Sequence, residues 1–424
     1  MTEQGPFPRN ARYRIHRWLL DVFGRLDPGS ALHREALERQ ALRIAGVPGF
    51  LDPTFREPLE RFLESVRLEA RLNSLGRALT GSFIRRCLVN RLSLEQLWAG
   101  PRPAWPAQSW PSRPPLYIVG LPRTGTTMLH RLLAADPAGR PLRYWEASYP
   151  VRTPQRFGTP SAEGVRRAAA VTMINRVNGL APYLKGIHEI DPLGPEECYL
   201  LLANTFISYG YPLQWDCAAY LEWLDTRTAS DWTEVYRHYL ATLRTLEGGR
   251  HDRHWVLKCP LHAAQVGVLR SLVPSAIYVQ TYRDPREVVG SLCSLSAALM
   301  SLGSDRLDMK AIGLRALKHL SVQAQASLEA CSQCPDDVVA THFKTLIRDP
   351  LSTVRAIYDR AGLPLSGEAV AAMNAWLARN PQGRHGPHRY SLTDFGLTER
   401  QVLDAFGDYL LVERSLDPAL PKNR

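Results

Sequence analysis

Residues 116–129 constrain the fold of this chain more than any other segment. They read LYIVGLPRTGTTML: an apolar stretch typical of a strand, a turn that contains Gly120 and Gly125, and the start of a helix. In nucleoside-triphosphate-binding loops, two glycines enclose four residues and are followed by Lys and then Ser or Thr. The glycine spacing is kept here, but Thr126 takes the lysine position, and the cation is Arg123 inside the loop.

An arginine in such a loop favours a tetrahedral anion. Its guanidinium offers a planar fork of donors, and the backbone N–H groups of the loop and of the helix N-terminus point toward the same place. We therefore predict that the loop binds a phosphate or sulfate group rather than magnesium–ATP. The predicted binding residues are Pro122, Arg123, Thr124, Gly125, Thr126 and Thr127.

After this loop, strand and helix patterns alternate. Residues 255–257 and 276–282 are expected to be strands, and a helix is expected after Asp284, which is a typical N-cap with Pro285 at the first helical position. This alternation predicts an α/β protein, with a P-loop-like parallel sheet flanked by helices and an N-terminal helical accessory region.

Three regions are expected along the chain. Residues 1–99 form the helical region, in which Leu59, Phe62, Leu63 and Val66 recur on one face of a helix. Residues 100–115 hold six prolines and form a connector. Residues 116–424 form the α/β domain.

The charge of the chain is basic but does not indicate nucleic-acid binding. Of the 52 basic residues 46 are arginine, against 41 acidic residues, and no run of consecutive basic residues resembles a DNA-binding arm. The arginine excess is more typical of a GC-rich coding sequence. We predict no nucleic-acid partner.

The seven cysteines are scattered and odd in number, which fits a reducing cytoplasm. Cys331 and Cys334 form a single CxxC pair without a redox or metal-binding context, so we interpret them as ordinary thiols.

No signal peptide is recognised, and the longest uncharged run, residues 198–215, is interrupted by Asn, Gly, Pro and Gln, so no membrane span is expected. The sequence therefore predicts a cytoplasmic protein.

The N-terminus leaves two interpretations open. Arginines precede an apolar segment, so residues 9–23 could form a basic amphipathic helix on the anionic inner membrane surface. The plainer interpretation, which we prefer from the sequence, is a helix docked on the protein body with its arginines in water. Nothing in the sequence specifies an oligomeric state.

A second motif lies where the strand of residues 276–282 ends. Arg283 follows this strand and Ser291 comes eight residues later, and such corners bind ligands in open α/β sheets. The loop and this corner together resemble the sulfotransferase superfamily, whose members use 3′-phosphoadenosine 5′-phosphosulfate (PAPS). The resemblance covers roughly residues 115–412 and is strongest to the bacterial branch, with some likeness to tyrosylprotein sulfotransferases.

The resemblance implies roles for these residues. The loop would hold the 5′-phosphosulfate, and Arg283 with Ser291 would hold the 3′-phosphate. The segment of residues 382–390 loosely resembles a further 3′-phosphate element, through Arg384 and Gly386. The transferred sulfuryl group carries less charge than a phosphoryl group, so no metal is expected.

Catalytic residues are also implied. A glutamate about twenty residues after the loop acts as base in related enzymes, and Glu146 is the matching position; His188 is the rival base and is ranked second. Lys258, at the end of the second expected strand, would stabilise the sulfuryl group. Glu196 and Glu197 are assigned to a helix N-terminus rather than to chemistry.

The expected function is transfer of a sulfuryl group from PAPS to an acceptor hydroxyl by in-line displacement. Residues 199–223 and 292–302 are expected to wall an apolar pocket, which favours a hydrophobic or lipid-linked acceptor over a sugar or phenol. One alternative is a P-loop kinase-like phosphotransferase, which would need a lysine at position 126. Another is a non-catalytic, membrane-associated nucleotide-binding module.

Overall fold

One parallel sheet of five strands organises the molecule. A computed structural model describes residues 7–23, 32–100, 110–151, 162–248, 252–381 and 390–419. The strand order is β2–β3–β1–β4–β5. The strands are β1 (Leu116–Ile118), β2 (Gly139–Pro141), β3 (His254–Lys258), β4 (Ile277–Tyr282) and β5 (Val338–His342). The predicted α/β class is confirmed, and β1 lies at the centre, where parallel ladders join it to β3 and β4.

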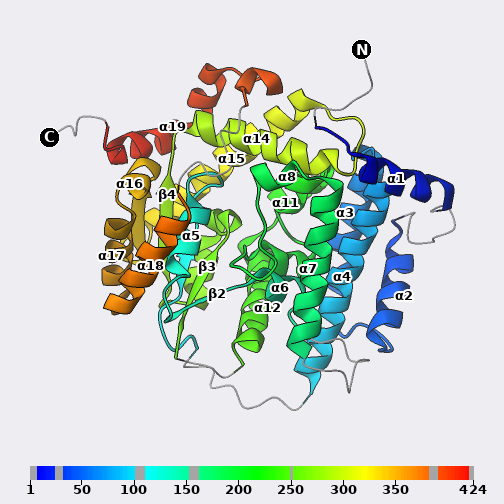
Figure 1. Cartoon of the computed structure of the whole chain (residues 1–424), viewed down its shortest axis with the longest axis horizontal. Helices are drawn as coiled ribbons and strands as arrows, with labels where there is room; N and C mark the ends of the chain where they lie inside the picture. Colours follow the sequence, from blue (N-terminus) through cyan, green and yellow to red (C-terminus); the bar gives the residue numbers. More distant parts are fainter. Residues whose placement is uncertain are drawn as a thin grey trace.

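Helices surround the sheet and form most of the described chain (Figure 1). The N-terminal helices are α1 (Ala11–Phe23), α2 (Arg34–Ala45), α3 (Arg56–Glu69) and α4 (Ser74–Ala99). Between β1 and β4 come α5 (Thr126–Leu133), α6 (Tyr144–Ser148), α7 (Ala162–Leu180), α8 (Leu184–Ile187), α9 (Tyr199–Leu202), α10 (Tyr211–Gln214), α11 (Ala218–Asp225), α12 (Ala229–Glu247) and α13 (Val266–Leu272). The C-terminal part contains α14 (Pro285–Ser301), α15 (Met309–Ser332), α16 (Phe343–Arg348), α17 (Pro350–Ala361), α18 (Gly367–Arg379) and α19 (Glu399–Leu416).

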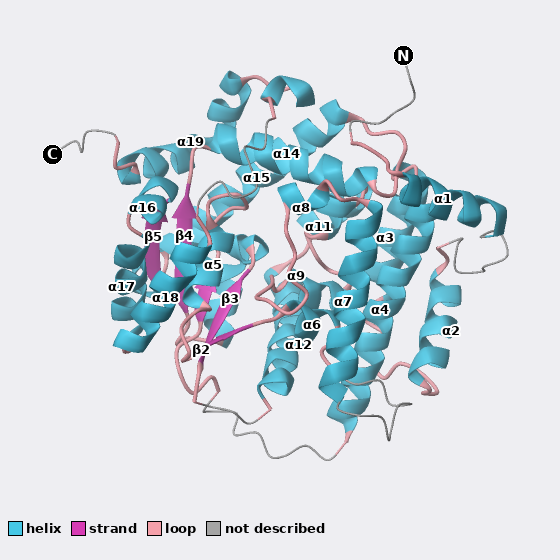
Figure 2. Cartoon of the chain, viewed as in Figure 1, coloured by secondary structure: helices cyan, strands magenta, loops and turns pink. Residues whose placement is uncertain are grey.

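Short 3-10 segments complete the described structure: η3 (Ala203–Thr205), η4 (Pro260–Gln265), η5 (Pro335–Asp337) and η6 (Leu392–Phe395). Figure 2 shows the strands gathered in one half of the molecule, with α2, α3, α4 and α7 in the other. The uncharged run of residues 198–215 contains the short elements α9, η3 and α10.

Both faces of the sheet are buried, as expected for parallel strands. Along β1, Leu116 and Ile118 face a core shared with α5 and α17, whereas Tyr117 faces a larger core shared with α3 and α4. The N-terminal helices thus pack into the same core as one side of the sheet. The boundaries between the three regions remain a prediction.

The corner after β4 forms as the sequence indicates. The carboxylate of Asp284 accepts the backbone N–H of Arg286 at 2.8 Å, and Pro285 occupies the first turn of α14. The side chain of Glu287 pairs with Arg283 in the preceding turn. This corner therefore fixes Arg283 at the carboxyl end of the sheet.

The helices and the cysteines bear on two expectations from the sequence. Within the described ranges, no helix is both long and apolar enough to cross a bilayer. All seven cysteines are buried free thiols.

Buried neutral histidines make the stability depend on pH. His130 of α5 is 1% exposed, and its Nε2 lies 3.2 Å from the carbonyl oxygen of Val256 in β3. Burial lowers the pKa of His130 to about 3. Burial lowers the pKa of further histidines in the same direction: His188, His238, His254, His262 and His319.

We predict that the free energy of unfolding falls as the pH is lowered from 7 to 5.5. Below pH ~6.5 a histidine that stays neutral in the folded chain is protonated in the unfolded one, so the buried His130 contributes a loss that approaches about 1.4 kcal/mol per pH unit. Chemical denaturation at several pH values measures this slope. His130→Gln keeps a donor for the Val256 carbonyl but cannot titrate, and should reduce the slope by about one such contribution. An unchanged slope would contradict the assignment.

Candidate active site

The loop after β1 lies against β4 because Gly120 has no side chain. A Cβ at this position would lie 2.0 Å from the Thr281 hydroxyl oxygen. The loop ends at Gly125, the N-cap of α5, whose φ of +89° is in the left-handed region and which offers no side-chain acceptor. The first N–H groups of α5 are therefore not capped by a side chain.

Arg123 connects the loop to the β4–α14 corner. Its backbone also lies in the left-handed region, at φ 68°. Its Nε donates to the hydroxyl of Ser291 at 2.9 Å, and a terminal nitrogen of Arg283 donates to its carbonyl oxygen at 2.8 Å. The two motifs that the sequence suggested are thus in direct contact.

The two arginines bring two guanidinium groups close together, and of the two only Arg283 forms an ion pair among the described residues, with Glu287. Burial lowers the pKa of Arg123, and the neighbouring charge of Arg283 lowers it further. The Arg283 guanidinium stacks over the Phe343 ring at 4.3 Å, and its buried Nε has no hydrogen-bond partner among the described residues. A bound anion would supply the missing acceptor and relieve the repulsion.

A second polar group lies on the other side of the loop. Lys258 ends β3 and is 2% exposed; its Nζ pairs with the carboxylate of Glu197 and donates to the Thr127 hydroxyl at 3.3 Å. The backbone N–H of Cys198 donates to the Lys258 carbonyl at 3.0 Å, which fixes Glu197 beside β3. An ammonium, a carboxylate and a loop hydroxyl therefore meet at the start of α5.

A cavity of about 460 Å³ joins these groups to an apolar wall. Its polar lining includes Arg123, Thr126, Thr127, His188, Glu197 and Arg283. Its apolar lining includes Leu72, Leu79, Phe83, Met173, Val177, Leu213, Trp215, Leu292, Leu295, Leu299, Met300 and Leu302. Both segments expected to wall an apolar pocket contribute to it.

Most of the predicted loop residues reach this cavity. Pro122, Arg123, Gly125, Thr126 and Thr127 line it. Thr124 instead donates to the Leu121 carbonyl at 2.6 Å and contacts the Thr281 hydroxyl, so it holds the loop in place. Arg384 and Gly386 lie outside the described residues.

The two predicted bases differ in position. The carboxylate of Glu146 pairs with Arg140 at 2.8 Å and accepts the backbone N–H of Arg143 at 3.0 Å, as part of a capping box for α6. Glu146 is not among the residues that line the cavity. His188 does line it, and burial lowers its pKa to about 4, so the ring is neutral near pH 7.

Glu197 is the residue that the sequence interpretation assigned to a helix end. The signal that could have found it is a pair of adjacent glutamates at the start of an otherwise uncharged segment. Burial raises the pKa of its neighbour Glu196 to about 7. Of the two carboxylates, Glu197 lines the cavity.

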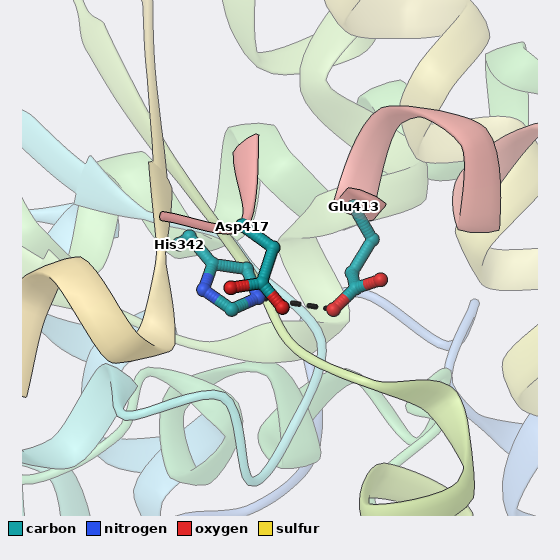
Figure 3. Close-up of side chains that lie close together, drawn as sticks. All are labelled: His342, Glu413 and Asp417. Carbon is teal, nitrogen blue, oxygen red and sulfur yellow. Dashed lines mark hydrogen bonds and ion pairs between the residues drawn. The ribbon is translucent and has the colours of Figure 1, made fainter. Parts of the chain in front are cut away.

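A trio of potential metal ligands lines a second, smaller pocket together with Arg283. Ligand atoms of His342, Glu413 and Asp417 lie within 4.8 Å of one another (Figure 3). His342 Nδ1 accepts the backbone N–H of Lys344, so its Nε2 carries the proton and donates to Glu413 at 3.0 Å; Asp417 pairs with Lys344 at 2.6 Å. These bonds satisfy the trio without an ion, and they support the strand end beside Phe343.

Comparison with known proteins identifies the chemistry. A sequence model described as "Sulfotransferase family" matches residues 114–367, which include the loop, Lys258, Arg283 and Ser291. The chain belongs to the sulfotransferase family. It is therefore a sulfotransferase by descent, and the family supports sulfuryl transfer to a hydroxyl.

Individual relatives agree with this family. Omega-hydroxy-beta-dihydromenaquinone-9 sulfotransferase Stf3 of Mycobacterium bovis and of Mycobacterium tuberculosis is 24% identical over 69% of this chain and 75% of its own length. The crystal structure of sulfotransferase STF1 of M. tuberculosis has 29% identity and a TM-score of 0.74, covering 89% of this chain and 98% of its own. Sulfotransferase STF9 of Mycobacterium avium has 25% identity and a TM-score of 0.78, covering 92% and 98%.

We predict that Arg123→Ala and Arg283→Ala each weaken the binding of adenosine 3′,5′-bisphosphate by ~1.5–3 kcal/mol, the scale of hydrogen bonds to charged groups. Isothermal titration calorimetry measures the loss. Arg286→Ala is the matched control, because Arg286 lies in the same corner but pairs with Asp284 and Glu399 and does not line the cavity. An equal loss in all three variants would indicate a general charge effect instead.

Proposed function

We propose that this protein transfers the sulfuryl group of PAPS to a hydroxyl of a hydrophobic or lipid-linked acceptor, by in-line displacement. The observation that carries the proposal is the single cavity that joins an arginine-lined anion loop to a largely apolar wall. PAPS, when bound, supplies the sulfuryl group and a phosphate leaving group.

The residues present fit this donor. Arg123 and the uncapped N–H groups of α5 suit the phosphosulfate, and Arg283 with Ser291 suits the 3′-phosphate. The buried Arg283 Nε without a partner supports this assignment, since it leaves a donor for an anionic oxygen. Arg384 and Gly386 stay predicted contacts of the same phosphate. We propose transfer without a metal, because the side chains of Arg123 and Lys258 can supply positive charge to the reacting group.

Glu197 is our candidate for the base that removes the acceptor proton. Both carboxylates are ion-paired, Glu197 with Lys258 and Glu146 with Arg140, but of the two only Glu197 lines the cavity beside the loop. Lys258 and Thr127 would stabilise the charge that develops on the sulfuryl oxygens. His188 remains the second candidate, because its neutral ring also lines the cavity.

The acceptor is proposed from the cavity wall. Helices α4, α7 and α14 contribute Leu, Met, Val and Phe side chains, which favour a long apolar group. The name of the relative Stf3 describes a hydroxylated menaquinone derivative as its acceptor, which supports a lipid here.

One cation lies within this apolar wall. Arg86 of α4 packs over the rings of Phe83 and Tyr149, at 5.2 and 5.8 Å, and pairs with no carboxylate in the described part of the chain. Its donors are available to an oxygen of the acceptor. We therefore favour a lipid with a carbonyl or an anionic group over a plain alkyl alcohol.

The alternatives are less well supported. A kinase-like phosphotransferase would need a lysine at position 126, where this chain has Thr126, and the family match is to sulfotransferases. A non-catalytic module would bind the nucleotide without turnover. We place the reaction in the cytoplasm, because buried free thiols fit a reducing compartment.

We predict that purified protein transfers labelled sulfur from PAPS into the lipid fraction of a bacterial extract, rather than into its water-soluble sugars. Mass spectrometry of the labelled product identifies the acceptor. Label in the sugar fraction would overturn the acceptor class. Nucleotide binding without any labelled product would favour the non-catalytic module.

We predict that Glu197→Gln lowers kcat by about 10²–10⁴-fold, the usual contribution of a general base, while the binding of adenosine 3′,5′-bisphosphate stays within a few-fold. Glu146→Gln is the matched control and should leave kcat within about ten-fold, since its role is to cap α6 and pair with Arg140. His188→Asn tests the second candidate in the same assay. A large kcat loss in Glu146→Gln alone would restore the base that the sequence favours.

A further inference from the structure

Helix α1 exposes an apolar face to solvent. Ile15, Trp18, Leu19 and Val22 are 56%, 61%, 41% and 50% exposed. Their spacing of i, i+3, i+4 and i+7 places them on one side of the helix, which we call the outer face of α1. Among the described residues, thirteen large hydrophobic side chains are 37% or more exposed, and no other helix carries more than two of them. The outer face is therefore a patch rather than scattered exposure.

The other side of α1 is firmly attached. The hydroxyl of Tyr13 accepts a hydrogen bond from Asn73 at 3.0 Å, and Asp305 pairs with both Arg9 and Arg17, at 2.7 and 2.9 Å. The side chain of Asn10 donates to the Gly179 carbonyl of α7 at 2.9 Å. Two of the four arginines that suggested a basic helix thus anchor it, and the outer face stays turned away from the body.

The attached side covers part of the acceptor cavity. Tyr13 and Leu20 pack in a small cluster with Leu75, Leu79, Leu180 and Leu302. Leu79 and Leu302 also line the cavity. Figure 1 shows α1 (dark blue) at the edge of the molecule, next to α4. The outer face and the apolar cavity wall are therefore separated by a single helix.

The unpaired charges beside the outer face are positive, whereas the exposed carboxylate of Asp21 pairs with Arg17 at 3.6 Å. At about 100° per residue, Arg12 and Arg14 fall on opposite sides of it. Both are exposed, and neither forms an ion pair with any residue that the structure describes; the side chain of Arg12 lies over Gly179 of α7, whose added Cβ would come within 2.6 Å of its guanidinium. An apolar stripe between two unpaired cations is complementary to a bilayer that contains anionic lipids.

We infer that the outer face of α1 docks the protein on an anionic lipid bilayer, with Trp18 among the apolar anchors, and so places the apolar cavity wall next to the membrane. Helix α1 is docked on the body, as the interpretation preferred from the sequence expects, and the membrane contact of the other interpretation is what we propose here. Delivery of a lipid acceptor into the cavity rests on the proposed function. Membrane binding itself does not, because it requires no turnover.

The test is co-sedimentation with vesicles of phosphatidylcholine and phosphatidylglycerol, and with vesicles of phosphatidylcholine alone. The protein should bind the anionic vesicles more tightly, and less so as salt rises. Replacing the outer face by Ile15→Ala, Trp18→Ala, Leu19→Ala and Val22→Ala preserves helix propensity and should weaken binding by more than about ten-fold. The Arg12→Gln and Arg14→Gln changes should each weaken it by roughly five-fold.

The matched control carries four equally exposed leucines changed to Ala elsewhere on the surface: Leu68, Leu97, Leu314 and Leu411. It should bind vesicles like the unmodified protein. Binding of adenosine 3′,5′-bisphosphate should be the same in all variants, which shows that the cavity is intact and separates this test from the sulfotransferase assay.

Three results would overturn the inference. The first is no preference of the unmodified protein for anionic vesicles, and the second is equal vesicle binding by the outer-face variant. The third is a dimer in sedimentation equilibrium that the outer-face variant converts to monomer without any vesicle binding, because the occupant of the face would then be a second copy of the chain.

Discussion

The hydrogen bond from Arg283 to the carbonyl oxygen of Arg123 joins two corners of the sheet, and the candidate site depends on it. The bond is available because β1 lies between β3 and β4, so the segments after all three strands meet at one edge. It also helps to fix Arg123 in a left-handed conformation that is uncommon for a residue with a side chain. Arg283 is partly balanced by Glu287, whereas Arg123 has no ion pair among the described residues, so an anion bound beside Arg123 would reduce the repulsion between the two cations.

Local patterns were sufficient to predict the parts of the site that lie on one continuous segment. The loop, the strands at both motifs and the Asp284 cap were all recognisable because each depends on neighbours in the sequence. Strand β2 was missed, since Gly139–Pro141 contains neither β-branched nor aromatic residues and is formed by pairing with β3. Strand β5 was missed as well. Val338–His342 lies at an edge of the sheet and is partly exposed, so it lacks the continuous apolar run of a central strand.

Glu197, the base that we propose, was harder to find from the sequence because the evidence for it is non-local. Glu197 and Lys258 are sixty-one positions apart, and only the fold brings the carboxylate to the ammonium. Glu146 was favoured by its spacing from the loop, and its partner Arg140 was close in sequence. No local signal distinguished a carboxylate that caps a helix from one that faces a cavity. The capping box of α6 makes the structural role of Glu146 visible.

Helix α14 spans the cavity from the side proposed for the sulfuryl donor to the side proposed for the acceptor. Ser291 bonds to Arg123 near its start, and Leu292, Leu295 and Leu299 line the apolar wall further along. A rigid helix keeps these two functions at a fixed separation. Helix α1 packs on the other side of this apolar wall, against Leu79 and Leu302. Helix α1 buries Tyr13 on its attached side but leaves Ile15, Trp18, Leu19 and Val22 exposed. Apolar packing of Tyr13 and Leu20, together with the ion pairs of Arg9 and Arg17 to Asp305, holds the attached side on the body. Apolar side chains exposed to water are unfavourable, and we explain the outer face of α1 by its contact with a second, apolar environment, which a bilayer supplies.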